Sequence, residues 1–320
     1  MKVITREEAA SLLRDYDKVA VLMHKSPDGD AVGCAFALCT ALRRLGKQAQ
    51  PFCSDPIPQK YAYLTDGFEE QVFEPEKVVS VDIATEQLFG EALKPFCGRV
   101  DLCIDHHGSN SHFAACEVVD PAAGACTQVI AQMIELMGVP LDSYLADAIF
   151  TGITTDTGCF KYSNAKADSF RMAADMIEKG AQSAMINRLM FDTKSRERLE
   201  AEKLALASMR YYADGLIAVI RVTKEMLRIS GAEESDTEGI ASIPRQVEGV
   251  KVGVTIREKD HGEFKLSVRT TDDVDASRIC AQFGGGGHKA AAGARVEGGT
   301  LQEVFEQVLD AACEYLGVER

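Results

Sequence analysis

No two of the ten cysteines in this sequence of 320 residues are spaced as C-x-x-C, the arrangement common in structural zinc sites and redox pairs. Cys34, Cys39, Cys103 and Cys159, the most tempting candidates for such chemistry, lie in apolar stretches. We therefore interpret them as reduced thiols in the core, and the spacing argues against disulfides and against a zinc site.

The sequence also lacks a long apolar run. No stretch approaches the roughly 20 apolar residues that a helix needs to cross a bilayer, and the N-terminus does not resemble a signal peptide. We expect no membrane association and a cytoplasmic protein, and the unpaired thiols agree with that compartment.

Positive charge is scarce, because 35 Lys and Arg stand against 49 Asp and Glu, a net charge of −14. Proteins that follow long nucleic acids need a cationic track, so we expect none here. A small phosphorylated substrate in a local pocket stays compatible with this charge, and an acidic chain can also bind divalent cations. The length favours two domains, since a domain typically holds about 100–200 residues.

The first half of the chain alternates strands with helices. Apolar runs of strand length occupy residues 18–23, 48–53, 77–81 and 99–104, and a helical pattern over 31–45 follows the first of them. This alternation predicts an α/β fold with a doubly wound, mostly parallel sheet and flanking helices. In such sheets ligands bind beyond the carboxyl ends of the strands.

The second half is helical at first and then mixed. Helices are predicted over 126–137, 143–154, 165–179, 195–213, 276–283 and 301–316, and strands over 216–222, 251–257 and 264–270. We expect a first domain over 1–185 and a helical linker over 186–213, where residues 187–203 carry many charges. A smaller mixed α/β domain would follow over 214–320, across a cleft from the first.

Acids and imidazoles stand where the predicted strands end. His24 opens the loop 24–30 after the first strand, Asp82 follows the third, and Asp105-His106-His107 follow the fourth. Within the loop, Pro27 and Gly29 force a kink, so that His24, Asp28 and Asp30 can point at one place. Asp156 comes at the end of a helical stretch. We expect these groups to converge on one metal centre.

The carboxylates exceed what one ion needs, which suggests two ions that share a bridging carboxylate. Oxygen and imidazole ligands without a thiolate favour Mn²⁺ or Mg²⁺ over structural zinc. Two such ions roughly 3.5–4 Å apart suit the hydrolysis of phosphoesters. The alternative for any single Asp is a turn or a helix cap, which is its commonest role in loops; the agreement in position among several strand ends favours the metal centre.

Together these motifs resemble those of the DHH phosphoesterase superfamily, and more closely those of its oligoribonuclease and pAp-phosphatase branch. The motifs that carry the resemblance are His24-Lys25-Ser26-Pro27-Asp28-Gly29-Asp30-Ala31, Asp82, Asp105-His106-His107 and Thr155-Asp156-Thr157-Gly158. The glycine-rich run Gly284–Gly293 is similar to the hallmark of the C-terminal domain associated with this superfamily. The motifs span nearly the whole chain in the family's order.

The resemblance implies a role for each motif residue. One Mn²⁺ would be held by His24, Asp28 and Asp82, and a second by Asp30, Asp82, His106 and Asp156, with Mg²⁺ as the alternative metal. Asp105 would lie behind the ligands and orient His106. His107 would face the phosphate of the substrate, and a water activated by both ions would attack it.

The run Gly284–Gly293 is expected to be a loop that binds substrate. Glycines let backbone N–H groups approach a phosphate closely, although such runs are as often flexible turns. The expected contacts are Gly285, Gly286, Gly287, His288 and Lys289. For Arg269 a phosphate or base contact and a solvated strand residue are equally favoured. Weaker candidates are Arg245 and Arg257 for phosphate, and Tyr211, Tyr212 and Phe283 for base stacking, where core packing is favoured for each aromatic.

The function implied is hydrolysis of short RNA oligonucleotides to nucleoside 5′-monophosphates and of pAp to AMP, with linear dinucleotides as further substrates. The nearest alternative is a phosphodiesterase for cyclic or linear dinucleotides. A non-catalytic nucleotide-binding protein is the alternative outside enzymes, and the complete ligand set argues against it. A homodimer is considered, although the sequence does not set the oligomeric state.

Overall fold

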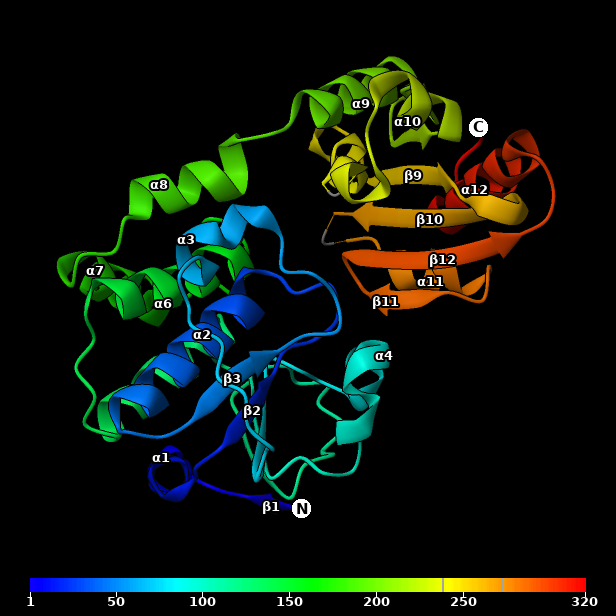
Figure 1. Ribbon diagram of the computed structural model, residues 1–320. Helices are drawn as coiled ribbons and strands as arrows, with labels where there is room; N and C mark the ends of the chain where they lie inside the picture. The colour runs from blue at the N-terminus through cyan, green and yellow to red at the C-terminus, as the bar shows by residue number, and fades with distance from the viewer. Residues whose placement is uncertain (238, 272) are drawn as a thin grey trace. The chain divides into compact units, whose positions relative to one another are not determined.

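The computed structural model describes residues 1–237, 239–271 and 273–320. They form two compact units, Met1–Thr193 and Lys194–Arg320, and each unit contains one six-stranded sheet (Figure 1). Within these ranges no helix combines the length and the apolar character that a bilayer span requires. All ten cysteines are free thiols; of the four expected in the core, Cys34, Cys39 and Cys103 are buried, whereas Cys159 is only partly buried.

The sheet of the first unit is parallel throughout. Its strands lie in the order β1-β6-β5-β4-β2-β3. Their bounds are β1 (Lys2–Val3), β2 (Val19–Leu22), β3 (Ala49–Phe52), β4 (Lys77–Val81), β5 (Leu102–Asp105) and β6 (Cys116–Val119). The predicted parallel sheet is therefore confirmed, whereas β1 and β6 were not predicted. From β2 the chain runs to β3 on one side and then returns to β4 on the other. The strand order therefore reverses between β2 and β4, which is a topological switch point.

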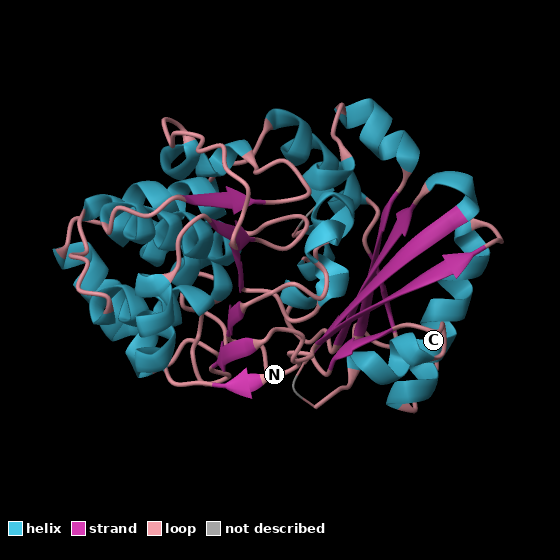
Figure 2. Cartoon of the chain, turned by 60° about the horizontal axis from the view of Figure 1, so that its bottom comes forward, coloured by secondary structure: helices cyan, strands magenta, loops and turns pink. Residues whose placement is uncertain are grey.

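Helices cover both faces of this sheet unequally (Figure 2). On one face Val19, Val21 and Ile104 pack with residues of α1 (Arg6–Asp15), α2 (Gly29–Arg44) and α5 (Cys126–Leu136). On the other face Ala20 and Leu22 pack with Phe89 and Leu93, at the short helix α4 (Gly90–Leu93). The remaining helices of the unit are α3 (Ala62–Thr65), α6 (Ser143–Asp156), α7 (Ala167–Glu178) and α8 (Ser183–Asn187). The doubly wound arrangement holds, with long helices on one face only.

The sheet of the second unit is mixed. Its strands lie in the order β11-β12-β10-β9-β8-β7, with β8 and β9 parallel and the other pairs antiparallel. The strands are β7 (Arg210–Tyr212), β8 (Ile217–Val222), β9 (Val252–Glu258), β10 (Glu263–Thr270), β11 (Gly286–His288) and β12 (Ala291–Glu297). The helices are α9 (Arg196–Ala207), α10 (Lys224–Ser230), α11 (Ala276–Ala281) and α12 (Leu301–Leu316). The predicted mixed α/β class of this part is confirmed.

Two stretches differ from the sequence prediction. The helix expected over 195–213 ends at Ala207, because Arg210–Tyr212 pairs with β8 as strand β7. Accordingly the range 186–213 is not one helix: a π-helical turn, Arg188–Asp192, belongs to the first unit, and α9 and β7 belong to the second. The glycine-rich run expected as a loop is largely an antiparallel hairpin of β11 and β12.

Candidate metal centre

The N-terminus of α2 presents two carboxylates. Asp28 is the N-cap, and its Oδ1 accepts hydrogen bonds from the backbone N–H groups of Asp30 (3.0 Å) and Ala31 (3.1 Å). Asp30 is fully buried and accepts from the N–H groups of Cys126 (2.5 Å) and Thr127 (2.9 Å), in the first turn of α5. Two helix N-termini thus hold these carboxylates, since backbone donors and helix dipoles favour negative charge there.

Glycines let α6 pack closely against α2. A Cβ at Gly152 of α6 would lie 2.4 Å from Oδ1 of Asp30, and one at Gly33 of α2 would lie 2.4 Å from the carbonyl oxygen of Ala148. Real Cβ atoms essentially never come this close to other atoms, so a larger residue at either position would force its neighbours to shift. The close packing brings Asp156, the last residue of α6, to the N-terminus of α2.

Asp82 lies between two groups of ligands. It directly follows β4 with φ 56°, in the left-handed region that Asp tolerates better than most residues. Its side chain is buried, with Oδ2 at 3.8 Å from Nε2 of His24 and Oδ1 at 3.6 Å from Nε2 of His106. The two oxygens of one carboxylate therefore face different imidazoles, which is the geometry of a bridging ligand.

Backbone carbonyls set the orientation of two imidazoles. Nδ1 of His24 lies 2.8 Å from the oxygen of Lys25, and Nδ1 of His106 lies 3.2 Å from that of Ala123. A carbonyl can only accept, so each Nδ1 carries the proton and each Nε2 keeps its lone pair for a metal. Nε2 of His106 lies 3.5 Å from Oδ2 of Asp156 and 3.8 Å from Oδ2 of Asp30, and Nε2 of His24 lies 3.7 Å from Oδ1 of Asp28.

Asp105 orients His107 and not His106, in contrast to the expectation from the sequence. Its Oδ1 accepts from Nδ1 of His107 (2.7 Å), and its Oδ2 accepts from Nδ2 of Asn110 (2.6 Å). The hydrogen bond with Asp105 raises the pKa of His107, whose ring is partly exposed. His106 receives only a backbone contact from Asp105, through its N–H at 2.7 Å.

The donor set fits divalent cations. In the part of the chain that the structure describes, Oδ1 of Asp82 and Nε2 of His106 are buried without a hydrogen-bond partner. Burial, and then the charges of Asp30 and Asp28, raise the pKa of Asp82 well above its usual range and that of Asp156 to about 8. Lone pairs without donors and crowded carboxylates are costly unless cations satisfy them. Three groups have ligand atoms within 4.8 Å of one another: His24, Asp28 and Asp82; Asp30, His106 and Asp156; and Asp82, His106 and His107.

Asn164 was missed by the sequence analysis. Its Nδ2 donates to the carbonyl oxygens of Gly124 (3.0 Å) and Asp156 (3.1 Å), and it lies 3.4 Å from Oδ2 of Asp156. It thus joins the C-terminal end of α6, which carries Asp156, to the loop whose Ala123 carbonyl holds His106. An asparagine in an irregular loop has no periodic signal, so only the structure reveals this role.

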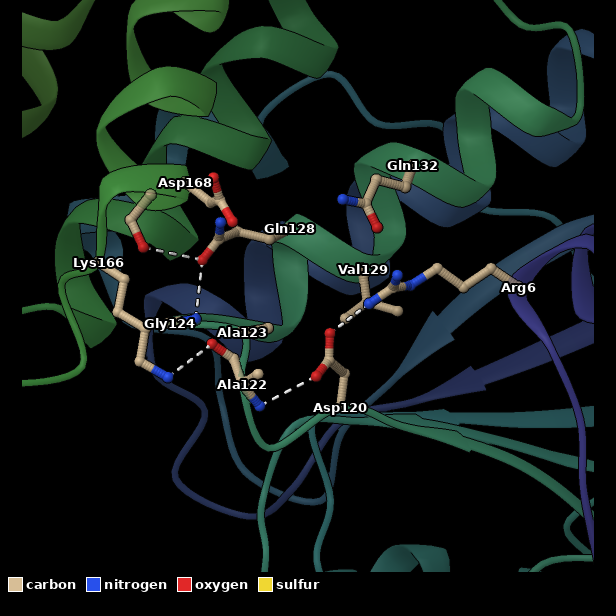
Figure 3. A pocket seen from close by; sticks show the side chains of 11 residues that line it. Arg6, Asp120, Ala122, Ala123, Gly124, Gln128, Val129, Gln132, Lys166 and Asp168 are labelled. Atoms are coloured by element: carbon tan, nitrogen blue, oxygen red, sulfur yellow. Dashed lines mark hydrogen bonds and ion pairs between the residues drawn. The ribbon is translucent and has the colours of Figure 1, made fainter.

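A pocket of about 160 Å³ is lined in part by the loop 120–124, and none of the candidate metal ligands is among its lining residues (Figure 3). Arg6 forms an ion pair with Asp120 there, and Nζ of Lys166 donates to the carbonyl oxygen of Ala122 (3.1 Å). These contacts hold the loop whose next carbonyl, that of Ala123, accepts a hydrogen bond from Nδ1 of His106. The residues that line the pocket therefore help to position His106.

Two candidate substrate residues of the second unit lie on the strands that flank β12. Arg269 on β10 and His288 on β11 are both opposite Ala291 on β12, so their side chains leave the same face of the sheet. The glycines serve strand pairing: a Cβ at Gly287 would lie 2.7 Å from the oxygen of Ala291, and one at Gly285 would lie 2.3 Å from that of Gly293. Around Gly286 there is open space, and the side chain of Lys289 is exposed.

These elements match known domains in the same order. Residues 18–153 match the DHH family, N-terminal domain, and residues 215–317 match the DHHA1 domain. The chain is 35% identical over 307 residues to the bifunctional oligoribonuclease and PAP phosphatase NrnA of Thermus thermophilus, which covers 93% of this chain and 90% of that protein. The chain belongs to the DHH family.

Two further likenesses are more distant. The chain is 23% identical to the cyclic-di-AMP phosphodiesterase GdpP of Geobacillus thermodenitrificans over 95% of this chain, but it spans only 48% of that protein. Among solved structures, an exopolyphosphatase-related protein from Bacteroides fragilis has a TM-score of 0.87 at 23% identity and covers 97% of this chain and 96% of its own. At this identity the structure shows the shared fold.

Proposed function

We propose that the protein is a phosphoesterase, dependent on divalent metal ions, that hydrolyses short RNA oligonucleotides to nucleoside 5′-monophosphates and pAp to AMP. The 35% identity to an oligoribonuclease and PAP phosphatase over nearly the whole chain supports this substrate class. The first unit would be catalytic and the second would bind substrate.

The observation that carries the proposal is the position of Asp82 between two imidazoles. In this proposal His24, Asp28 and Asp82 hold one ion, and Asp30, Asp82, His106 and Asp156 hold a second, with Mn²⁺ as the expected metal. Two such ions, when bound, lower the pKa of a water and neutralise charge on a phosphoryl group. Hydrogen bonds to the backbone hold four of the six proposed ligands in place, namely Asp28, Asp30, His24 and His106, which supports this assignment.

In this proposal His107 faces the phosphate of the substrate, as the family resemblance implies. Its Nδ1 already donates to Asp105, which leaves Nε2 as the ring nitrogen for a phosphate oxygen. The same hydrogen bond favours the protonated ring. A cationic imidazole beside the scissile phosphate would stabilise the negative charge that develops during attack.

For the second unit we propose that the face carrying Arg269 and His288, with Gly285, Gly286, Gly287 and Lys289 nearby, binds the nucleotide. His288→Ala should raise KM for pAp and leave Mn²⁺ affinity unchanged, because the residue belongs to the second unit whereas all candidate metal ligands belong to the first. Steady-state kinetics and a Mn²⁺ titration measure both quantities. Loss of metal binding in this variant would show that the hairpin is assigned to the wrong role.

The proposed function is tested by incubating the protein with Mn²⁺ and either pAp or a five-nucleotide RNA. We expect AMP and phosphate from pAp and nucleoside 5′-monophosphates from the RNA, and both reactions should stop when EDTA removes the metal. An Asp30→Asn variant provides the inactive control. If wild-type protein with Mn²⁺ releases neither product, the proposal fails.

A second candidate function is hydrolysis of cyclic or linear dinucleotides, which the likeness to GdpP favours. The same metal centre would serve, because the scissile group is again a phosphodiester. Adding cyclic di-AMP and pGpG to the assay separates the two functions. Faster turnover of either dinucleotide than of pAp and of the five-nucleotide RNA would favour the second.

A further inference from the structure

An aromatic residue six positions after the candidate ligand Asp156 has no role in the core. Tyr162 is 62% exposed. Its neighbour Phe160 packs on a hydrophobic cluster of the first unit, with ring centroids 6.3 Å from Phe150 and 5.0 Å from Phe170. Tyr162 does not belong to that cluster, so core packing accounts for Phe160 and leaves the exposure of Tyr162 unexplained.

The backbone that carries Tyr162 is strained and firmly held. Gly158, Cys159 and Phe160 are three consecutive residues in the left-handed region, with φ of 58°, 56° and 62°. Such conformations cost free energy in non-glycine residues and persist only where the surroundings enforce them, often at functional sites. Here the N–H groups of Lys161 and Tyr162 both donate to the carbonyl oxygen of Thr157 at 3.0 Å.

The strained turn folds the ring back over Gly158, two residues after the candidate metal ligand Asp156. The outer edge of the Tyr162 ring lies over Gly158, where a Cβ would come within 2.3–2.6 Å of three ring carbons. Glycine is therefore needed two residues after Asp156 for the ring to take this position. Two residues beyond Tyr162, Nδ2 of Asn164 donates to the carbonyl oxygen of Asp156 and lies 3.4 Å from its carboxylate, so the far end of the segment is held at Asp156.

We propose that Tyr162 is a stacking platform for a nucleobase of the substrate, at the nucleotide whose phosphate meets the metal centre. This inference rests on the proposed function and makes it more specific. An exposed ring on a fixed backbone loses little conformational freedom on binding, and every base offers a π-face to it. The platform would thus favour nucleotides over other phosphoesters without selecting one base.

The absence of tryptophan from the sequence permits a direct test. Tyr162→Trp creates a single fluorophore at the platform, and Phe170→Trp creates the matched control in the neighbouring aromatic cluster, at a similarly exposed site (52%). In the full chain with Mn²⁺, we expect AMP to quench Trp at position 162 and ribose 5-phosphate, which lacks the base, to leave it unchanged. Neither compound should affect Trp at position 170.

Kinetics complete the test. Tyr162→Ala should raise KM for pAp about tenfold with unchanged Mn²⁺ affinity, the scale of losing one aromatic partner of a base, whereas Tyr162→Phe should stay near wild type. Equal responses to AMP and ribose 5-phosphate, or none, would overturn the platform. So would emission that depends on protein concentration and not on nucleotide, which would mark a contact between copies of the chain. Base-dependent quenching in a protein that fails to hydrolyse pAp and RNA would uphold the platform and reject the proposed function.

Discussion

At the scale of single residues, the metal centre is defined by buried atoms that lack partners. Oδ1 of Asp82 and Nε2 of His106 lie 3.6 Å apart, and neither has a hydrogen-bond donor or acceptor among the described residues. A protein that folded around this arrangement without cations would bear the cost of desolvating both groups. A cation that binds both groups would therefore stabilise the arrangement.

Asn164 gives the sharpest prediction about a residue outside the known motifs. Asn164→Ala should weaken about tenfold the binding of the Mn²⁺ ion proposed to lie between Asp156 and His106. The reason is that Asn164 connects the end of α6, which carries Asp156, with the loop 120–124, which orients His106. The matched control is Asn187→Ala. It removes a hydrogen bond with Thr154, which lies on α6 like Asp156, but it involves no candidate ligand. Mn²⁺ titration by calorimetry measures the difference, and equal affinities in the two variants would show that Asn164 is only structural.

The types of ligand residue could be predicted from the sequence, but their partners could not. The sequence identifies His24, Asp82 and Asp105 as candidate site residues because each follows an apolar run of strand length. Parallel strands bring such positions together at one edge of the sheet. Which imidazole Asp105 orients depends on the turn after β5, and the sequence resemblance suggested His106 where the structure shows His107. Asn164 and Tyr162 lie in an irregular loop, where no periodic pattern in the sequence predicts which way a side chain points.

At the scale of elements, the packing of α2 against α6 sets the spacing of the ligands. Asp30 and Asp156 belong to these two helices, and glycine at Gly33 and Gly152 allows them to approach. Sequence periodicity predicted both helices and the start of α5, because apolar residues recur at helical spacing. It could not show that the first turn of α5 donates to Asp30, since that contact joins residues 96 positions apart.

Replacing either glycine of the α2–α6 contact with alanine should lower stability, but only one of the two replacements should also affect metal binding. Gly152→Ala places Cβ against Asp30 and Thr127, and Gly33→Ala places it against the backbone of Ala148. Each should lower the free energy of unfolding by about 1–3 kcal/mol through overpacking. Only Gly152→Ala should also weaken Mn²⁺ binding, because it displaces a ligand. Urea denaturation measures the loss of stability, and a Mn²⁺ titration measures the loss of metal affinity. Identical metal affinities in the two variants would argue against Asp30 as a metal ligand.

The glycine-rich run shows a limit of sequence reasoning at this scale. Four glycines suggest a loop because glycine adopts many conformations. In the structure Gly285 and Gly287 are needed for a different reason, since they let the edge strand β11 pair closely with β12. Strand pairing over such short segments depends on the partner strand, and the sequence of one strand does not contain that information.

At the scale of the whole molecule, net charge limits the substrates. A chain of net charge −14 attracts long RNA poorly, because binding along a polyanion depends on many cationic contacts. We expect a five-nucleotide RNA to be hydrolysed faster per chain than a thirty-nucleotide RNA under the same conditions. Gel analysis of end-labelled RNA measures both rates. Equal rates on the two lengths would contradict a preference for short substrates.

The central claim is that one carboxylate, Asp82, joins two metal ions that perform the hydrolysis. The most direct measurement is the number of Mn²⁺ ions bound per chain, together with turnover of pAp, in wild-type protein and in Asp82→Asn, which keeps the shape of the side chain. The account predicts two ions in the wild type, weakened binding of both in the variant, and loss of turnover by about a hundredfold or more. Turnover near the wild-type level in Asp82→Asn, or a single ion in the active wild-type protein, would contradict it.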